Sequence, residues 1–383
     1  MKEKFVFPSK NSYLCSTNFI PFVMFSITYN ANLLAHNTFK MEVKAAILAE
    51  YETAGDLQPL LQQPDVQALM EKNRQRGQLP FWHIGSGSNL LFQGDYDGVV
   101  LHCKAQGMQL IDDTPTQTLL QVQAGTIWDD VCAYCADQGL YGTENLSLIP
   151  GEAGAAAVQN IGAYGVEMKD IVESVICWDL LQDCPCTLTA QDMQYGYRQS
   201  LLKQPEAKSR YIVTSVILRL TRQPHLHLEY AGLKQALQPE TLEPGTQKSE
   251  TLPSPTPAAV RSAVIRIREG KLPDPQVLGN AGSFFKNPIV PNELFQRLLL
   301  SYPTMPHYVV DATHTKIPAG WLIEQCGWKG KSLGRAGVYQ KQSLVLVNLG
   351  GATPKEIITL CQTVRRDVLQ KFGIDIEPEV NII

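Results

Sequence analysis

A serine in the segment GNAGSFFKNP, residues 279–288, is the first candidate for chemistry in this chain. Small residues precede Ser283 and two phenylalanines follow it, so a ligand can approach one side while the other side is buried. No Gly-x-Ser-x-Gly turn surrounds Ser283 and no histidine lies within twenty residues of it, which argues against a hydrolytic nucleophile. By residue type alone, a capping serine remains the alternative.

Two glycine-rich segments could bind a phosphate-bearing cofactor. Residues 84–92, IGSGSNLLF, follow a predicted strand, where backbone N–H groups and hydroxyls can face a phosphate, although a tight turn explains the same residues. Residues 145–172 combine glycine and alanine into a surface with few side chains, suited to a flat ligand or to close packing of a helix on a sheet. Neither segment has Walker or Rossmann spacing.

The composition is that of a globular protein, with 383 residues, 44% hydrophobic and 18% charged. A net charge of -4 argues against a nucleic-acid partner, and nine irregularly spaced cysteines favour a reducing, cytoplasmic location. Cys132 and Cys135 fall in an amphipathic pattern, so we expect buried thiols and no metal site. The apolar run in residues 18–27 is short and contains a proline. We therefore expect no membrane span, and expect residues 1–36 to form a poorly ordered extension.

The pattern along the chain predicts an α+β fold. Helix and strand patterns alternate over residues 37–101, strands dominate residues 97–220 around a helix at 128–138, and amphipathic helices follow residue 257. The last helix has Pro354 in its first turn and Gly373 at its end. Residues 238–257 are rich in Pro, Ser, Thr and Glu, which predicts a linker before a second compact domain.

Seven motifs occur in order along the chain: GSGSNLLF, IPGEAGAAAVQNIGAYGVE, GYRQSLLK, KLPDP, GNAGSFFKNP, AGWLIEQCGWKG and IEPEV. Together they resemble the MurB family, UDP-N-acetylenolpyruvoylglucosamine reductase, over residues 37–383, in the class with a mobile tyrosine loop. The resemblance implies an FAD-binding unit of the vanillyl-alcohol-oxidase (PCMH) type with subdomains at 37–104 and 105–237. An α+β substrate-binding domain would follow at 258–383. Two departures are Ala157, where the family commonly has proline, and a longer segment before Ala258.

The resemblance also implies the residues of the site. The catalytic set is Arg198, Ser283 and Glu379, with Glu377 as the alternative to Glu379. The implied substrate contacts are Tyr230, Lys271, Asn287 and Gln342. The implied FAD contacts are Gly85, Ser86, Gly87, Ser88, Asn89, Leu90, Pro150, Gly151, Gly154, Ala155, Gln159, Asn160, Ile161, Gly162, Ala163 and Tyr164.

The implied activity is the reduction of UDP-N-acetyl-3-O-(1-carboxyvinyl)glucosamine to UDP-N-acetylmuramate with NADPH, a step of peptidoglycan synthesis. Hydride from flavin N5 would add to the terminal alkene carbon and leave negative charge that spreads into the carboxylate. Arg198 would stabilise that charge, and Ser283 would protonate the neighbouring carbon. Glu379 would either stabilise the intermediate together with Arg198 or take part in proton delivery. We expect a monomer without a membrane partner. Two other functions remain open: an oxygen-using flavin oxidase of related fold, and a non-catalytic UDP-sugar binding protein.

Overall fold

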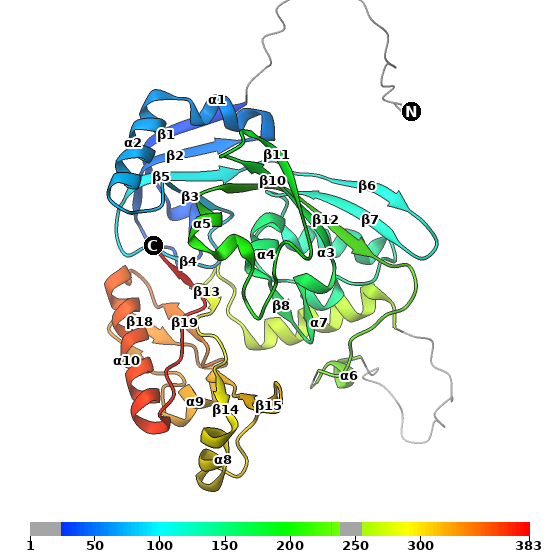
Figure 1. The fold of residues 1–383 in the computed structure, drawn as a ribbon. Helices are drawn as coiled ribbons and strands as arrows, with labels where there is room; N and C mark the ends of the chain where they lie inside the picture. The colour runs from blue at the N-terminus through cyan, green and yellow to red at the C-terminus, as the bar shows by residue number, and fades with distance from the viewer. Residues whose placement is uncertain (1–23, 231, 238–254) are drawn as a thin grey trace, which may run out of the picture.

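The computed structural model describes residues 24–230, 232–237 and 255–383. These residues form three sheet-based units in chain order, coloured from blue through green to red in Figure 1. Their mixed sheets and covering helices confirm the α+β class. Most of the linker expected at 238–257 lies outside the described residues.

The first unit is a four-stranded sheet with the order β1-β2-β5-β3. β2, β5 and β3 run parallel, as expected where helical crossovers join strands of one sheet. The central strand is buried on both faces, because Val99 and Leu101 belong to one hydrophobic core and Val100 to another. The elements of this unit are β1 (Phe25–Asn32), β2 (Lys44–Tyr51), α1 (Leu57–Leu61), α2 (Pro64–Gln75), β3 (Phe81–Ile84) and β5 (Tyr96–Cys103).

The N-terminal boundary expected at residue 37 is wrong. β1 pairs with β2 from Phe25 opposite Tyr51 to Asn32 opposite Lys44, and Leu33 is fully buried. Residues 25–32 therefore belong to the first sheet, and their sequence, FSITYNAN, has the alternation of apolar and polar residues that is typical of a strand. Residues 1–23, the rest of the expected extension, lie outside the described residues.

The second unit is an antiparallel sheet with the order β11-β10-β12-β7-β6. The predicted helix at 128–138 is confirmed as α3, in which Cys132 and Cys135 are both buried. The glycine- and alanine-rich segment contains a helix that the sequence analysis missed, α4, because alanine favours a helix even beside glycine. The elements are β6 (Met108–Asp113), β7 (Thr118–Gln123), α3 (Trp128–Asp137), α4 (Ala153–Gln159), β10 (Val172–Asp179), β11 (Cys184–Thr189) and β12 (Tyr211–Leu220).

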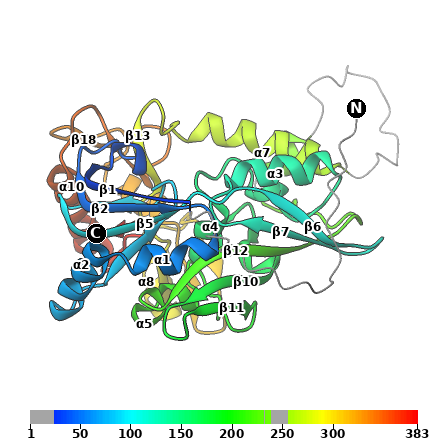
Figure 2. The ribbon, with the colours of Figure 1, turned by 90° about the horizontal axis from the view of Figure 1, so that it is seen from above.

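The domain boundary expected at residue 258 is wrong, because helix α7 (Pro257–Lys271) packs against the second unit. Figures 1 and 2 both show it beside α3 of the second unit. Val260 packs with Leu233 in a small core, and Arg261 holds Asp129 of α3 through two hydrogen bonds of 2.6 and 2.9 Å. An amphipathic pattern reveals that a helix has a buried face, but not which domain buries it. The C-terminal unit therefore begins after α7.

The C-terminal unit combines the sheet β13-β19-β18-β17 with a smaller sheet, β14-β16-β15. Its long helix α10 begins and ends as predicted, because Thr353 and Glu356 form a capping box and Gly373 closes the helix with a left-handed φ of 67°. The elements are β13 (Gly279–Ser283), β14 (Ile289–Pro291), α8 (Asn292–Ser301), β15 (Tyr308–Val309), β16 (His314–Lys316), α9 (Ala319–Gln325), β17 (Ser332–Leu333), β18 (Ala336–Val338), β19 (Val345–Asn348) and α10 (Pro354–Phe372).

The C-terminal segment returns to the first unit. Strand β20 (Asn381–Ile382) pairs in parallel with β4 (Leu90–Leu91), which directly follows the first glycine-rich loop. On the way, the Glu379 N–H donates to the carbonyl of Phe284 at 2.8 Å. The end of the described chain therefore connects the segment of Ser283 with the glycine-rich loop, as the red strand near β4 in Figure 1 shows.

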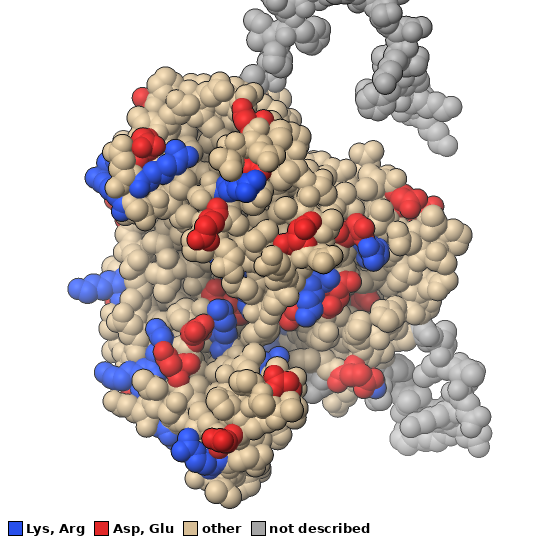
Figure 3. Space-filling model, viewed as in Figure 1, with Lys and Arg blue, Asp and Glu red and all other residues tan. Residues whose placement is uncertain are grey.

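Surface charge is mixed on the face shown in Figure 3. Lysine and arginine side chains there lie next to aspartate and glutamate, so the described residues of this face do not gather positive charge into one region. Among the described helices, none is long and apolar enough to cross a membrane.

Because α7 is anchored by a partly buried, bidentate ion pair, we expect Arg261→Met to lower the free energy of unfolding by about 1–3 kcal/mol in a denaturant titration. The side chains of Arg261 and Asp129 are 16% and 26% exposed. In the matched pair, the side chains of Arg222 and Asp113 are 37% and 39% exposed. Arg222→Met should therefore cost much less, because an exposed ion pair is screened by solvent. Equal losses in the two variants would contradict a special anchoring role for α7.

Candidate active site

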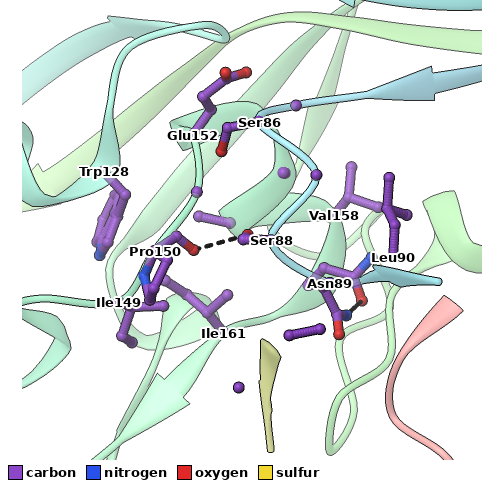
Figure 4. A pocket seen from close by; sticks show the side chains of 18 of the residues that line it. Ser86, Ser88, Asn89, Leu90, Trp128, Ile149, Pro150, Glu152, Val158 and Ile161 are labelled. Atoms are coloured by element: carbon purple, nitrogen blue, oxygen red, sulfur yellow. Dashed lines mark hydrogen bonds between the residues drawn. The ribbon is translucent and has the colours of Figure 1, made fainter. Parts of the chain in front are cut away.

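One cavity brings together residues from all three units of the fold. The first glycine-rich loop forms one wall and the segment around Pro150 faces it, as Figure 4 shows. The two walls are joined where the Ser88 hydroxyl donates to the Pro150 carbonyl at 2.9 Å. The C-terminal unit contributes Ser283 and the C-terminal segment contributes Glu379.

The first loop is suited to bind an anion. Within the described part of the chain, the backbone N–H groups of residues 86–89 donate to no protein acceptor, although these residues line the cavity. Successive unpaired N–H groups in a turn form a concave site for phosphate oxygens. The observed donors therefore fit the diphosphate of a dinucleotide.

Two glycines show that packing also limits side-chain size here. A Cβ on Gly87 would lie 1.8 Å from the carbonyl oxygen of His36, and φ at Gly87 is 73°. A Cβ on Gly151 would lie 2.8 Å from the Ser88 hydroxyl, at a φ of 129°. Both explanations of the glycine-rich segments therefore hold, because the glycines permit close backbone packing and also line the cavity.

Most of the expected cofactor contacts line the cavity. Three do not: Asn160, Ala163 and Tyr164. The buried Asn160 side chain instead donates to Glu167 and to the Gly196 carbonyl, so it supports the residues that line the cavity without lining it itself. The expected contacts that line the cavity are Gly85, Ser86, Gly87, Ser88, Asn89, Leu90, Pro150, Gly151, Gly154, Ala155, Gln159, Ile161 and Gly162.

Arg198 lies on a tight turn, with a left-handed φ of 55° that is uncommon for a residue other than glycine. Its guanidinium donates to the carbonyl of Gly162 at 2.7 Å and to that of Asn160 at 3.3 Å. Its Nε lies 2.7 Å from Oε1 of Glu379, a close ion pair that is not aligned as a hydrogen bond. These contacts fix the guanidinium at the wall of the cavity.

Glu379 is the partner of Arg198, and only 17% of its side chain is exposed. Burial raises the pKa of the Glu379 carboxyl, although the positive charges of Arg198, Lys203 and Lys286 oppose the shift. Ser283, at the end of β13, lines the same cavity. The structure therefore brings the three expected catalytic residues together, whereas the alternative Glu377 is exposed and contacts Lys286 instead.

The four expected substrate contacts do not line this cavity. Tyr230 packs edge-on against Tyr164, with ring centroids 5.3 Å apart, and Lys271 is exposed at the end of α7. The Asn287 side-chain oxygen accepts from Ala319 N–H at 2.9 Å, at the start of α9. Gln342 accepts a longer hydrogen bond, of 3.4 Å, from Leu344 N–H. Their roles as substrate contacts remain predictions.

Two charged residues that line the cavity, Arg268 and Glu152, were missed by the sequence analysis. Arg268 lies on α7, and its buried Nε has no acceptor within the described residues; burial lowers the pKa of this guanidinium. Arg268 lies outside the seven motifs, and the sequence analysis placed its helix in the C-terminal domain, away from the cofactor. Glu152 lies within the glycine-rich motif IPGEAGAAAVQNIGAYGVE, where small residues dominate and a single carboxylate has no distinctive spacing.

Glu152 belongs to a buried charged cluster beside the cavity. His102 Nε2 lies 3.1 Å from Glu152 and its Nδ1 lies 3.1 Å from Glu50. Burial alone lowers the pKa of His102, but hydrogen bonds and charge from the two carboxylates outweigh it and raise the pKa. Nearby, burial and the charge of His102 lower the pKa of His83 to about 3, so His83 remains neutral.

A cavity walled by two α+β subdomains, with amide donors suited to a diphosphate, fits a dinucleotide cofactor, and the match to a family model places the chain in the class of FAD-binding proteins. Residues 62–181 match the family described as FAD binding domain, and residues 274–383 match the UDP-N-acetylenolpyruvoylglucosamine reductase C-terminal domain. The second match begins after α7, in agreement with the corrected boundary.

Similar proteins cover almost the whole chain. UDP-N-acetylenolpyruvoylglucosamine reductase from Bacteroides fragilis is 46% identical over 92% of this chain and 98% of its own. The enzyme of that name from Chromobacterium violaceum is 42% identical over the same shares. The MurB crystal structure from Thermus caldophilus, at 23% identity, shares the fold, with a TM-score of 0.61 over 94% of this chain and 99% of its own. The chain belongs to the UDP-N-acetylenolpyruvoylglucosamine reductase family, as its motifs indicated.

The raised pKa of His102 predicts a pH-dependent stability. Its charged contacts stabilise the fold below the unfolded pKa of about 6.5, and this contribution is lost as the pH rises through the higher folded pKa. We expect His102→Gln to lower the free energy of unfolding by about 1–3 kcal/mol at pH 6, and by less at pH 9. His314→Gln, at a histidine whose side chain is 45% exposed, is the control. If the difference in the free energy of unfolding between wild type and His102→Gln grew towards pH 9, the conclusion that His102 is stabilised in its charged form would be wrong.

Proposed function

We propose that this protein reduces the enolpyruvyl double bond of UDP-N-acetyl-3-O-(1-carboxyvinyl)glucosamine with NADPH, producing UDP-N-acetylmuramate for peptidoglycan synthesis. The observation that carries the proposal is that Arg198, Ser283 and Glu379, from three distant segments, line one cavity with the loop that suits a diphosphate. Family membership supports the same activity. The expected monomeric state and cytoplasmic location remain predictions.

FAD is the cofactor of this family, and the cavity fits it. The amides of residues 86–89 would hold its diphosphate, and Arg268 would add a positive charge. When bound, FAD would supply the hydride chemistry that links NADPH to the substrate alkene. The remaining requirements of the reaction fall to side chains: orientation of the substrate carboxylate, stabilisation of charge, and delivery of one proton.

Arg198 is suited to the first two requirements. Its guanidinium is permanently charged and is fixed by two backbone carbonyls and by Glu379. When hydride adds to the terminal carbon, negative charge spreads from the neighbouring carbon into the carboxylate. A positive charge held in place before the reaction stabilises that enolate without reorganisation.

Ser283 would transfer its hydroxyl proton to the enolate carbon, which forms the new C–H bond. The resulting alkoxide would regain a proton from solvent. Glu379 lies close to this segment, since its N–H donates to the carbonyl of Phe284. Because burial raises its pKa, Glu379 can hold a proton more readily than an exposed carboxyl and is suited to assist this step.

The first test separates the two halves of the reaction. In anaerobic stopped-flow measurements, we expect Ser283→Ala to be reduced by NADPH within about threefold of the wild-type rate. Its flavin should be reoxidised by the UDP-enolpyruvyl sugar about 10²- to 10⁴-fold more slowly, because the proton donor is missing. Ser332→Ala, at an exposed serine on β17, is the control.

Three outcomes of this experiment would contradict the proposals. Normal turnover by Ser283→Ala would exclude the serine as proton donor. Wild-type protein that reoxidises rapidly in air but ignores the sugar would be an oxidase. Sugar binding without NADPH consumption would indicate a non-catalytic binding protein.

A second test concerns Arg268. We expect Arg268→Met to weaken FAD binding about tenfold or more in a fluorescence titration of the apoprotein, because a positive charge that lines the cofactor cavity is lost. The control is Arg266→Met, an exposed arginine on the same helix. Unchanged FAD affinity in Arg268→Met would remove Arg268 from the cofactor site.

A further inference from the structure

We propose that Lys203 is a positioning residue for the reduction, because its ammonium holds the backbone of Arg198 and the side chain of Gln159 in one geometry. This role rests on the proposed function, in which Arg198 binds the substrate carboxylate. The resemblance assigned no role to Lys203, although Lys203 is the last residue of the motif GYRQSLLK.

The Lys203 ammonium joins two walls of the site. It donates to the carbonyl of Arg198 at 3.0 Å and to Oε1 of Gln159 at 2.9 Å. The same Gln159 oxygen accepts from the Asn89 side chain at 3.3 Å, and both Gln159 and Asn89 line the cavity. Lys203 is thereby linked to the diphosphate loop on one side and to Arg198 on the other.

The backbone of Arg198 requires such support. A left-handed φ of 55° costs free energy in a residue with a side chain, and it persists only where surrounding contacts favour it. The turn is closed by two hydrogen bonds between Gly196 and Gln199, but the carbonyl of Arg198 is held by Lys203. Without Lys203, Arg198 can relax its backbone and move its guanidinium relative to Glu379.

The local position of Lys203 is itself well defined. It is the last residue of a short 3-10 helix, η5 (Leu201–Lys203). The preceding Ser200 hydroxyl donates to the carbonyl of Val158 at 2.7 Å, and Leu202 is buried. These contacts fix η5 against α4, so the lysine stem starts from a rigid base.

Charges around Lys203 make its positioning sensitive to pH. Burial lowers the pKa of Lys203 to about 8, assisted by Lys286 beyond β13, Lys208 of α5 (Pro205–Lys208) and Arg198, while Glu379 opposes the shift. The ammonium therefore loses its proton in mildly alkaline solution. A neutral amine retains donors but loses the strength of charge-assisted hydrogen bonds.

The test compares Lys203→Met and Lys203→Arg with wild-type holoenzyme in both half-reactions from pH 6 to 10. At pH 7 we expect Lys203→Met to be reduced by NADPH within about threefold of wild type. Its reoxidation by the UDP-enolpyruvyl sugar should be about 10- to 100-fold slower, because small misplacements of Arg198 are amplified in the rate. Lys203→Arg should restore most of this loss.

The pH profile distinguishes positioning from a purely structural role. Wild-type reoxidation should decline on the alkaline side near pH 8, and this decline should disappear in Lys203→Arg, because arginine retains its proton there. Lys208→Met is the matched control: it removes a neighbouring positive charge whose Nζ lies 5.0 Å from the Trp82 ring centroid, and it should retain wild-type rates at pH 7. Because Lys208 helps to lower the pKa of Lys203, its removal should move the alkaline decline to higher pH.

Three results would overturn the proposal: wild-type reoxidation by Lys203→Met, an equal loss in Lys208→Met, or an alkaline decline near pH 8 that persists in Lys203→Arg. The last result decides the matter even if Lys203→Met fails to fold or to retain FAD. If the flavin of the wild-type protein is not reoxidised by the sugar, the proposed function itself fails. If wild type and Lys203→Met are reoxidised at the same rate, only the positioning role of Lys203 fails.

Discussion

The contact between Arg198 and Glu379 is the constraint on which the site depends. Two opposite charges, each less than one-fifth exposed, lose much of their hydration and require each other as partners. Glu379 comes from the C-terminal segment and Arg198 from a turn in the second unit. Their contact therefore couples the position of the C-terminal segment to the geometry of the flavin-binding subdomains.

The first sheet provides the frame for this contact. Because alternate residues of β5 belong to different cores, one sheet is packed on both faces, against the second unit and against the C-terminal unit. A sheet held in this way has little freedom to tilt. The diphosphate loop, which follows β3 at the end of that sheet, is consequently presented from a rigid base to residues of both other units.

Much of the site could be predicted, because its residues belong to long motifs. Arg198, Ser283, Glu379 and both glycine-rich loops were found in this way, and all of them reach the cavity. Arg268 could not be predicted, because the amphipathic pattern of α7 shows that one face of the helix is buried but does not show which domain covers that face. Strand β1 was missed although its eight residues, FSITYNAN, alternate between apolar and polar, because they were grouped with the preceding segment into one poorly ordered extension.

The parallel pairing of β20 with β4 has a consequence for biosynthesis. Asn381 bonds to Asn89 across 292 positions of sequence. The first two subdomains can therefore emerge from the ribosome and collapse long before the strand that completes the loop beside Leu90 exists. During that interval β4 is an unpaired edge, open to other extended chains.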